Sequence, residues 1–101
     1  SRVVEIDPNG NHIREWPVQW GGARGGSHLV YWRGKVVMTD PDRHRLVVID
    51  LATNEVSFVG QNGNSDSQMN IPVGIAVGAD DKLYVMDSGN NRVLVFSDLE
   101  P

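Results

Sequence analysis

Hydrophobic and polar residues alternate along the chain in short runs of about four to eight positions, which is the pattern of half-buried β-strands. Turn-forming stretches such as Pro8-Asn9-Gly10 separate these runs. No stretch of a dozen residues keeps a helical period without a Gly, Pro or Asn-Gly interruption. The pattern therefore predicts an all-β chain of up-and-down hairpins without a helix. The strand-like runs are Arg2–Asp7, Asn11–Trp16, Ser27–Trp32, Lys35–Thr39, Arg45–Asp50, Glu55–Gly60, Val73–Val77, Lys82–Asp87 and Arg92–Ser97.

An internal repeat sets the architecture. The run Arg45–Asp50 echoes Arg2–Asp7 at an offset of 43 residues and returns as Arg92–Ser97 at an offset of 47. The preceding strand repeats as well, because Lys35–Asp40 matches Lys82–Asp87 at the same offset of 47. A period in the forties with four short strands per unit is typical of a β-propeller blade. We therefore expect antiparallel four-stranded blades.

The repeat divides the chain into three segments. With the strands of a blade lettered A to D from the propeller axis outward, the order is CD, ABCD, ABC. Residues 1–20 are then an outer half-blade, residues 21–60 a full blade, and residues 61–101 a blade without its outer strand. The 101 residues supply about two blades, whereas a propeller has about four to eight.

We expect oligomerisation to complete the ring, with three copies and six blades about a threefold axis as the simplest arrangement. The outer strand of the last blade would come from Asn11–Trp16 of the next copy. In that case Arg2–Asp7 and Arg92–Ser97 compete for the same C position. One of the two strands should be displaced, swapped or frayed.

Two segments carry a family resemblance. The stretch Asn70–Val77 followed by Leu83–Phe96, with its Asp-Ser-Gly-Asn-Asn-Arg turn, resembles an NHL repeat, and Val36–Asp50 resembles a degenerate copy. The resemblance implies a six-bladed propeller that acts as a binding platform, with some extracellular lyase relatives. The segment Glu15–Val18 before a Gly-rich loop is similar to NHL propellers attached to bacterial membrane proteins of glycosyltransferase type. That likeness implies the extracytoplasmic part of a bacterial membrane protein.

The amino-acid composition limits the classes of partner and cofactor that we expect. The chain has 15 valines against 4 alanines, which favours strands over helices. It carries 9 Lys and Arg against 13 Asp and Glu, a net charge of −4 that disfavours binding to a phosphate backbone. The absence of cysteine excludes a disulfide framework and a thiolate zinc site. We expect no cofactor, no nucleic acid partner and no membrane contact by this segment.

Two Asp and Arg pairs recur with the repeat. Asp40 with Arg45, and Asp87 with Arg92, flank the turn between strands B and C. We interpret them as structural locks, in which the carboxylate accepts turn amide protons and the guanidinium bridges back. Ligand groups are the alternative, although a ligand site would not need the same pair in every blade.

Aromatic residues gather around the Gly-rich loop, namely Trp16, Trp20, Tyr31 and Trp32. They fill the gap between adjacent blades or form a recognition surface for a sugar or a partner peptide. Trp20 and Trp32 are the candidates for exposure because they adjoin loop residues. Together with Arg43 and His44 they make the candidate binding surface for a protein or carbohydrate.

Catalytic signals are few. The histidines His12, His28 and His44 are spaced 16 residues apart and offer no local metal pair, and no Gly-x-Ser-x-Gly motif occurs. The leading hypothesis is a non-enzymatic propeller unit that self-assembles as an interaction scaffold. The alternatives are a hydrolase or lyase with a metal at the axis, for which the A strands supply little beyond His28, and a binder of single-stranded RNA.

Overall fold

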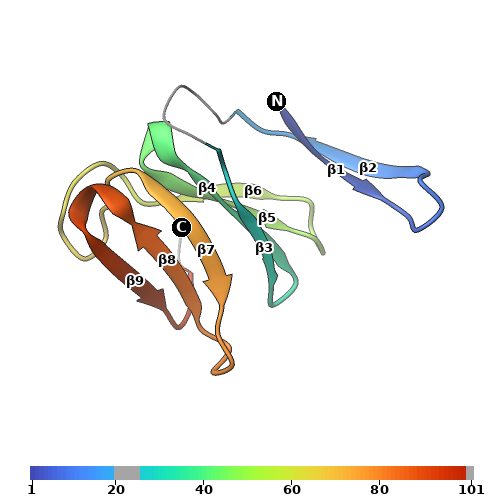
Figure 1. The fold of residues 1–101 in the computed structure, drawn as a ribbon. Coiled ribbons are helices and arrows are strands. Elements are labelled where there is room, and N and C mark those ends of the chain that lie inside the picture. Colours follow the sequence, from blue (N-terminus) through green and yellow to red (C-terminus); the bar gives the residue numbers. More distant parts are fainter. Residues whose placement is uncertain (20–25, 100–101) are drawn as a thin grey trace.

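The fold, taken from a computed structural model that describes residues 1–19 and 26–99, consists of three antiparallel sheets arranged one after another (Figure 1). The N-terminal hairpin pairs β1 (Arg2–Ile6) with β2 (His12–Pro17). The central sheet has the order β3 (Leu29–Trp32), β4 (Lys35–Asp40), β5 (Arg45–Asp50) and β6 (Val56–Val59). The C-terminal sheet has the order β7 (Pro72–Val77), β8 (Leu83–Asp87) and β9 (Arg92–Phe96).

The repeat seen in the sequence is also a repeat of strand register. In the central sheet Val36 lies opposite Ile49 and Asp40 opposite Arg45, and 47 residues later Leu83 lies opposite Phe96 and Asp87 opposite Arg92. The pairing of β1 with β2 matches that of β5 with β6 at an offset of 43 from Val3 to Glu5, and a bulge then sets Ile6 opposite His12. The three sheets are therefore copies of one strand arrangement, of which the hairpin holds the two outer strands.

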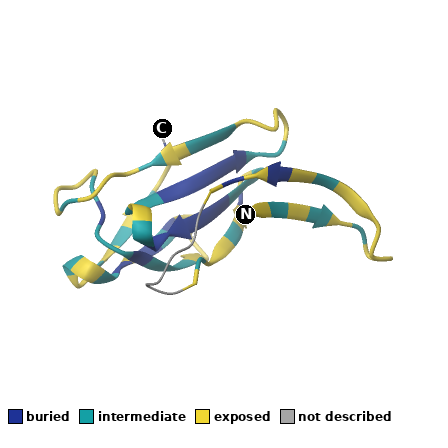
Figure 2. Ribbon diagram, turned by 90° about the horizontal axis from the view of Figure 1, so that it is seen from above, coloured by how far each residue is buried: buried dark blue, intermediate teal, exposed yellow. Residues whose placement is uncertain are grey.

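Each sheet has a rear face toward the preceding part of the chain and a forward face toward the following part. The rear face of the central sheet packs Met38, Val47 and Ile49 against Trp16 and Val18 of the hairpin segment. Its forward face packs Val37, Leu46 and Val48 against the rear face of the C-terminal sheet, which presents Leu83, Val85, Leu94 and Phe96. Figure 2 shows the result, with buried residues concentrated in the middle strands and burial alternating along the hairpin.

The prediction of an all-β fold with antiparallel blades is confirmed, and the described residues contain no α-helix. The turns between strands B and C wind as single 3-10 turns, Pro41–Arg43 and Ser88–Asn90, which the sequence pattern did not indicate. No helix among the described residues is long and apolar enough to span a bilayer. The division of the chain at residues 20 and 60 stays a prediction.

Candidate functional site

The turn between β8 and β9 is built around a buried carboxylate. Asp87 is fully buried, and its Oδ1 accepts the backbone N–H of Asn70 at 2.6 Å. Its Oδ2 accepts the Asn90 amide at 2.8 Å and Nε of Arg92 at 2.9 Å. Gly89 is required in this turn, because a Cβ there would lie 2.5 Å from the Asn70 side chain. The carboxylate therefore joins the turn to the segment that leads into β7.

Burial is the largest single influence on the pKa of Asp87, and it raises that pKa because it disfavours the charged form. The hydrogen bonds from Asn70, Asn90 and Arg92 favour the charged form and together outweigh burial. The pKa of Asp87 is therefore lowered below its ordinary value of 3.8. Asp87 is an ionised structural group at neutral pH.

The two arginines of the recurring pairs also hold the loop that precedes their blade. Arg92 donates to the carbonyl oxygens of Asn64, Ser65 and Gln68 at 2.8 to 3.0 Å. Arg45 binds Oδ2 of Asp40 at 3.0 Å and donates to the carbonyl of Gln19 at 3.1 Å. Both guanidinium groups are thus occupied by protein atoms, as the structural interpretation of these pairs expects.

The exposure predicted for Trp32 is wrong. Its side chain is buried in the forward core of the central sheet, and its Nε1 donates to the carbonyl of Asp81 at 3.0 Å. The neighbouring Arg33 stacks on the Trp32 ring and binds Oδ2 of Asp81 at 2.9 Å and the carbonyl of Ser97 at 2.6 Å. These contacts join the β3–β4 turn to the β7–β8 turn. The sequence pattern did not reveal them because Trp32 and Asp81 are 49 residues apart.

Two other members of the candidate binding surface, Arg43 and His44, make contacts within the protein. Trp20 lies outside the described residues. Arg43 contacts Oδ1 of Asp40 at 3.4 Å. His44 is half-buried, adopts a left-handed backbone with φ of 55°, and accepts the backbone N–H of Ile71 on Nδ1 at 3.1 Å. His44 therefore has the structural position that Asn91 occupies in the next repeat.

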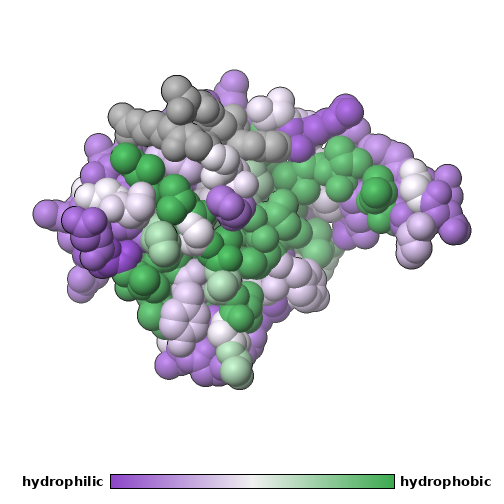
Figure 3. Space-filling model, in the orientation of Figure 1, coloured by the Kyte–Doolittle hydropathy of each residue, from purple (hydrophilic) through white to green (hydrophobic). Residues whose placement is uncertain are grey.

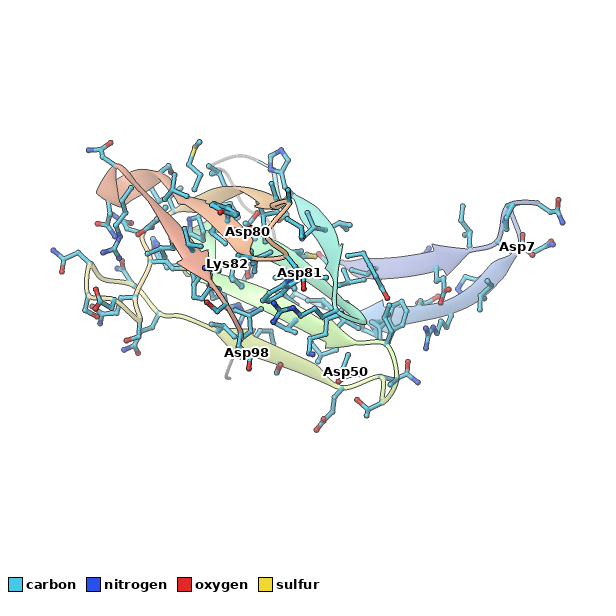
Figure 4. All side chains as sticks on the ribbon, turned by 90° about the horizontal axis from the view of Figure 1, so that it is seen from below. Asp7, Asp50, Asp80, Asp81, Lys82 and Asp98 are labelled. Carbon is cyan, nitrogen blue, oxygen red and sulfur yellow. The ribbon has the colours of Figure 1, made fainter. Side chains whose placement is uncertain are left out.

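The acidic residues of the turns, such as Asp7 and Asp80, lie far apart. Figure 4 shows Asp80, Asp81 and Lys82 together at the β7–β8 turn, with Asp7 at the distant tip of the hairpin. Oδ2 of Asp80 accepts the Tyr84 hydroxyl at 2.7 Å, which lowers the pKa of Asp80 and raises that of Tyr84. In the part of the chain that the structure describes, no group of three or more His, Asp or Glu side chains could hold a metal ion.

The forward face of the C-terminal sheet exposes apolar side chains. Met86, Val93 and Val95 are 51%, 55% and 51% exposed, although they lie on regular strands. Met86 and Val93 line a hollow of about 270 Å³ together with Gly74, Ala76 and Tyr84. In Figure 3 hydrophobic side chains form a green area over the region where Figure 1 draws β7 and β8. Exposed apolar patches of this kind are a common feature of protein interaction sites.

A second open feature runs beside β9. Among the described residues β9 pairs only with β8, so its outer edge has no strand partner. A groove of about 490 Å³ lies next to this edge, with Val59, Phe96 and Leu99 among its apolar walls and Gln61 and Asp66 among its polar ones.

The third open feature is the rear face of the hairpin. Val4, Ile6 and Ile13 are 38%, 61% and 54% exposed on it. The described part of the chain thus has an apolar forward face at one end and an apolar rear face at the other.

Comparison with known proteins agrees with the repeat. Residues 69–96 match the family model of the NHL repeat, which confirms the resemblance found in that stretch of the sequence. A search of curated proteins gave no match. The matched segment contains the buried Asp87, the Asn70 amide that it accepts and the Arg92 that pairs with it, so the structure gives a physical reason for the motif. Residues 69–96 therefore match an NHL repeat, within a small all-β chain of antiparallel sheets of the propeller-blade type.

Proposed function

We propose that the chain is a non-enzymatic propeller unit that self-assembles into a closed ring and serves as an interaction scaffold. The observation that carries the proposal is the exposed apolar forward face of the C-terminal sheet, with Met86, Val93 and Val95 half exposed. Exposed apolar side chains on a regular sheet favour association, because burial contributes about 25 cal/mol per Å² of apolar surface. The open edge of β9 adds unpaired backbone groups.

Three copies that each supply two blades make the six-bladed ring implied by the NHL resemblance. The loops at the two ends of the ring and its central channel then offer surface for a protein or carbohydrate ligand. The recurring Asp and Arg pairs support a non-enzymatic role, because these charged side chains bind each other and are not free to act on a substrate.

The decisive measurement is the mass of the 101-residue chain in solution by light scattering or native mass spectrometry. The expected result is a monodisperse species of three times the chain mass of 11.1 kDa. A folded monomer at micromolar concentration would overturn the proposal. A screen of ester and lactone substrates with divalent metals added should give no turnover, and turnover that is abolished by chelation would favour the hydrolase or lyase alternative.

A further inference from the structure

The repeat register assigns the occupant of each open face. Inside the chain, the forward face of the central sheet is covered by the rear face of the C-terminal sheet. The forward residues Val37, Leu46 and Val48 are buried there. Their counterparts 47 residues later are Tyr84, Val93 and Val95, on the exposed forward face. The surface that fits this exposed face is therefore another rear face of the same kind.

The rear face of a second copy's central sheet has the right shape and chemistry, but β1 and β2 cover it. Val3 of β1 and Trp16 of β2 pack there against Met38, Val47 and Ile49. Trp16 is held firmly, because its Nε1 donates to Oδ1 of Asn54 at 3.1 Å. Arg14 of β2 donates to the same atom at 3.0 Å and to the carbonyl of Leu51 at 2.9 Å. Strand β2 is thus anchored to the central sheet by its own side chains.

Strand β1 is anchored less well. No residue of β1 is buried, and within the described residues 1–19 and 26–99 the strand pairs only with β2. Its forward residues are Val3 and Glu5, opposite Trp16 and Arg14. Through β5 the register equates these two residues with Val93 and Val95 of β9. Strand β9 therefore has Val95 where β1 has the half-buried Glu5. Strand β9 is also part of a three-stranded sheet with β7 and β8.

We infer that β1 occupies, in the single chain, the position that β9 of a second copy takes on assembly. In this exchange β9 of one copy displaces β1 of the next and pairs with its β2. This inference rests on the proposed self-assembly and adds its mechanism. In the exchanged state Val93 and Val95 take the places of Val3 and Glu5 on the second copy's central sheet. Strand β2 of that copy becomes the fourth strand of the C-terminal sheet. The exposed Ile13 on its rear side then fills the groove beside β9.

Arg14 keeps two partners after the exchange, because its bonds to Leu51 and Asn54 do not involve β1. Glu5, which pairs with Arg14 in the hairpin, is released to solvent together with β1. No charge is left buried without a partner. The exchange therefore replaces a polar, partly hydrated contact with an apolar one and retains the ladder of backbone hydrogen bonds on β2.

The first test uses engineered cysteines, for which the natural chain provides a background free of thiols. Register places Val95 of one copy opposite Arg14 of the next in the exchanged state. A chain with Arg14→Cys mixed with a chain with Val95→Cys should give a covalent pair on mild oxidation. Arg14→Cys alone and Val95→Cys alone are the matched controls and should each give at least tenfold less covalent dimer.

The second test locks the hairpin. Val4 lies opposite Glu15, and both side chains are exposed, so Val4→Cys with Glu15→Cys should form a disulfide that ties β1 to β2. The oxidised protein should associate at least tenfold more weakly than the same protein after reduction, which is its own control. Equal association of the two forms, with no cross-link between positions 14 and 95, would overturn strand exchange while leaving self-assembly intact. A wild-type chain that stays monomeric would instead overturn self-assembly itself.

Discussion

Replacement of Asp87 by alanine tests the claim that the buried carboxylate of the β8–β9 turn has a structural role. The side chain is fully buried and accepts three hydrogen bonds, from the Asn70 backbone, the Asn90 amide and Arg92. A buried polar group left without its partner costs about 1 to 3 kcal/mol. Loss of one member of a buried ion pair costs about 3 to 5 kcal/mol. Because the Arg92 side chain is 28% exposed and can regain water, we expect Asp87→Ala to lower the free energy of unfolding by about 3 kcal/mol.

The assay is urea unfolding followed by circular dichroism at one protein concentration, since association makes stability depend on concentration. Asp87→Asn keeps an acceptor for the Asn70 amide and should lose about half as much free energy as Asp87→Ala. Asp66→Ala removes the same charge from an exposed loop and is the matched control. If Asp87→Ala unfolds at the same urea concentration as Asp66→Ala, the structural interpretation of the turn is refuted.

The lowered pKa of Asp87 gives the same test a pH dependence. The folded state binds a proton on Asp87 more weakly than the unfolded state does, so the ionised carboxylate stabilises the fold above the ordinary pKa of 3.8. This contribution should disappear as the pH falls below that value. The wild-type chain should therefore lose more stability than Asp87→Asn between pH 5 and acid conditions of about pH 3. Parallel curves would show that Asp87 has the same pKa in both states.

Three further predictions address the other features. Val95→Glu puts a charge on the exposed forward face and should weaken association at least tenfold, measured by light scattering across a dilution series. The control Ala52→Glu, on the exposed β5–β6 turn, should leave the oligomer mass unchanged. Trp32→Ala removes a side chain that is 3% exposed and should cost about 3 to 5 kcal/mol in urea unfolding, a loss that a solvent-exposed ligand platform would not show. His44→Val forces a β-branched residue to φ of 55° and should lower stability by about 1 to 2 kcal/mol, and His44→Asn should be tolerated, so equal midpoints would contradict the left-handed assignment.

The sequence contained most of the fold because the determining signals are local. Alternation of apolar residues places strands such as Arg45–Asp50, which the structure reproduces with the same bounds. The offset of 47 between Lys35–Asp40 and Lys82–Asp87 sets the register of two sheets at once. The turn residues Asp87 and Arg92 could be recognised because each pair recurs at a fixed spacing on either side of one turn.

The features that the sequence did not reveal depend on contacts between segments far apart. The sequence pattern predicts an exposed Trp32 because this residue precedes a turn, yet its indole N–H donates to the carbonyl of Asp81, which lies beside another sheet. His44 resembles a polar turn residue, and its bond to the Ile71 amide requires a segment 27 residues away. The bonds from Arg92 to three carbonyl oxygens of the preceding loop depend on the folded path of that loop, which the sequence pattern does not give. Such contacts have no period along the chain.

The effects of one substitution on folding and on association can be separated at the forward face, which makes Val95 more informative than a core position. Val95 is already half exposed in the single chain, so glutamate there removes little burial from the folded state. In the exchanged state the same position lies against an apolar face, where a carboxylate loses hydration and Arg14 offsets only part of that cost. Glu5, the counterpart of Val95 in β1, shows that the hairpin tolerates a carboxylate at this register only with Arg14 as its partner. In a Val95→Glu chain Arg14 could pair with the new carboxylate, so the additional change Arg14→Gln should weaken association further. An assembly interface that did not place Val95 beside Arg14 would respond to the two substitutions independently.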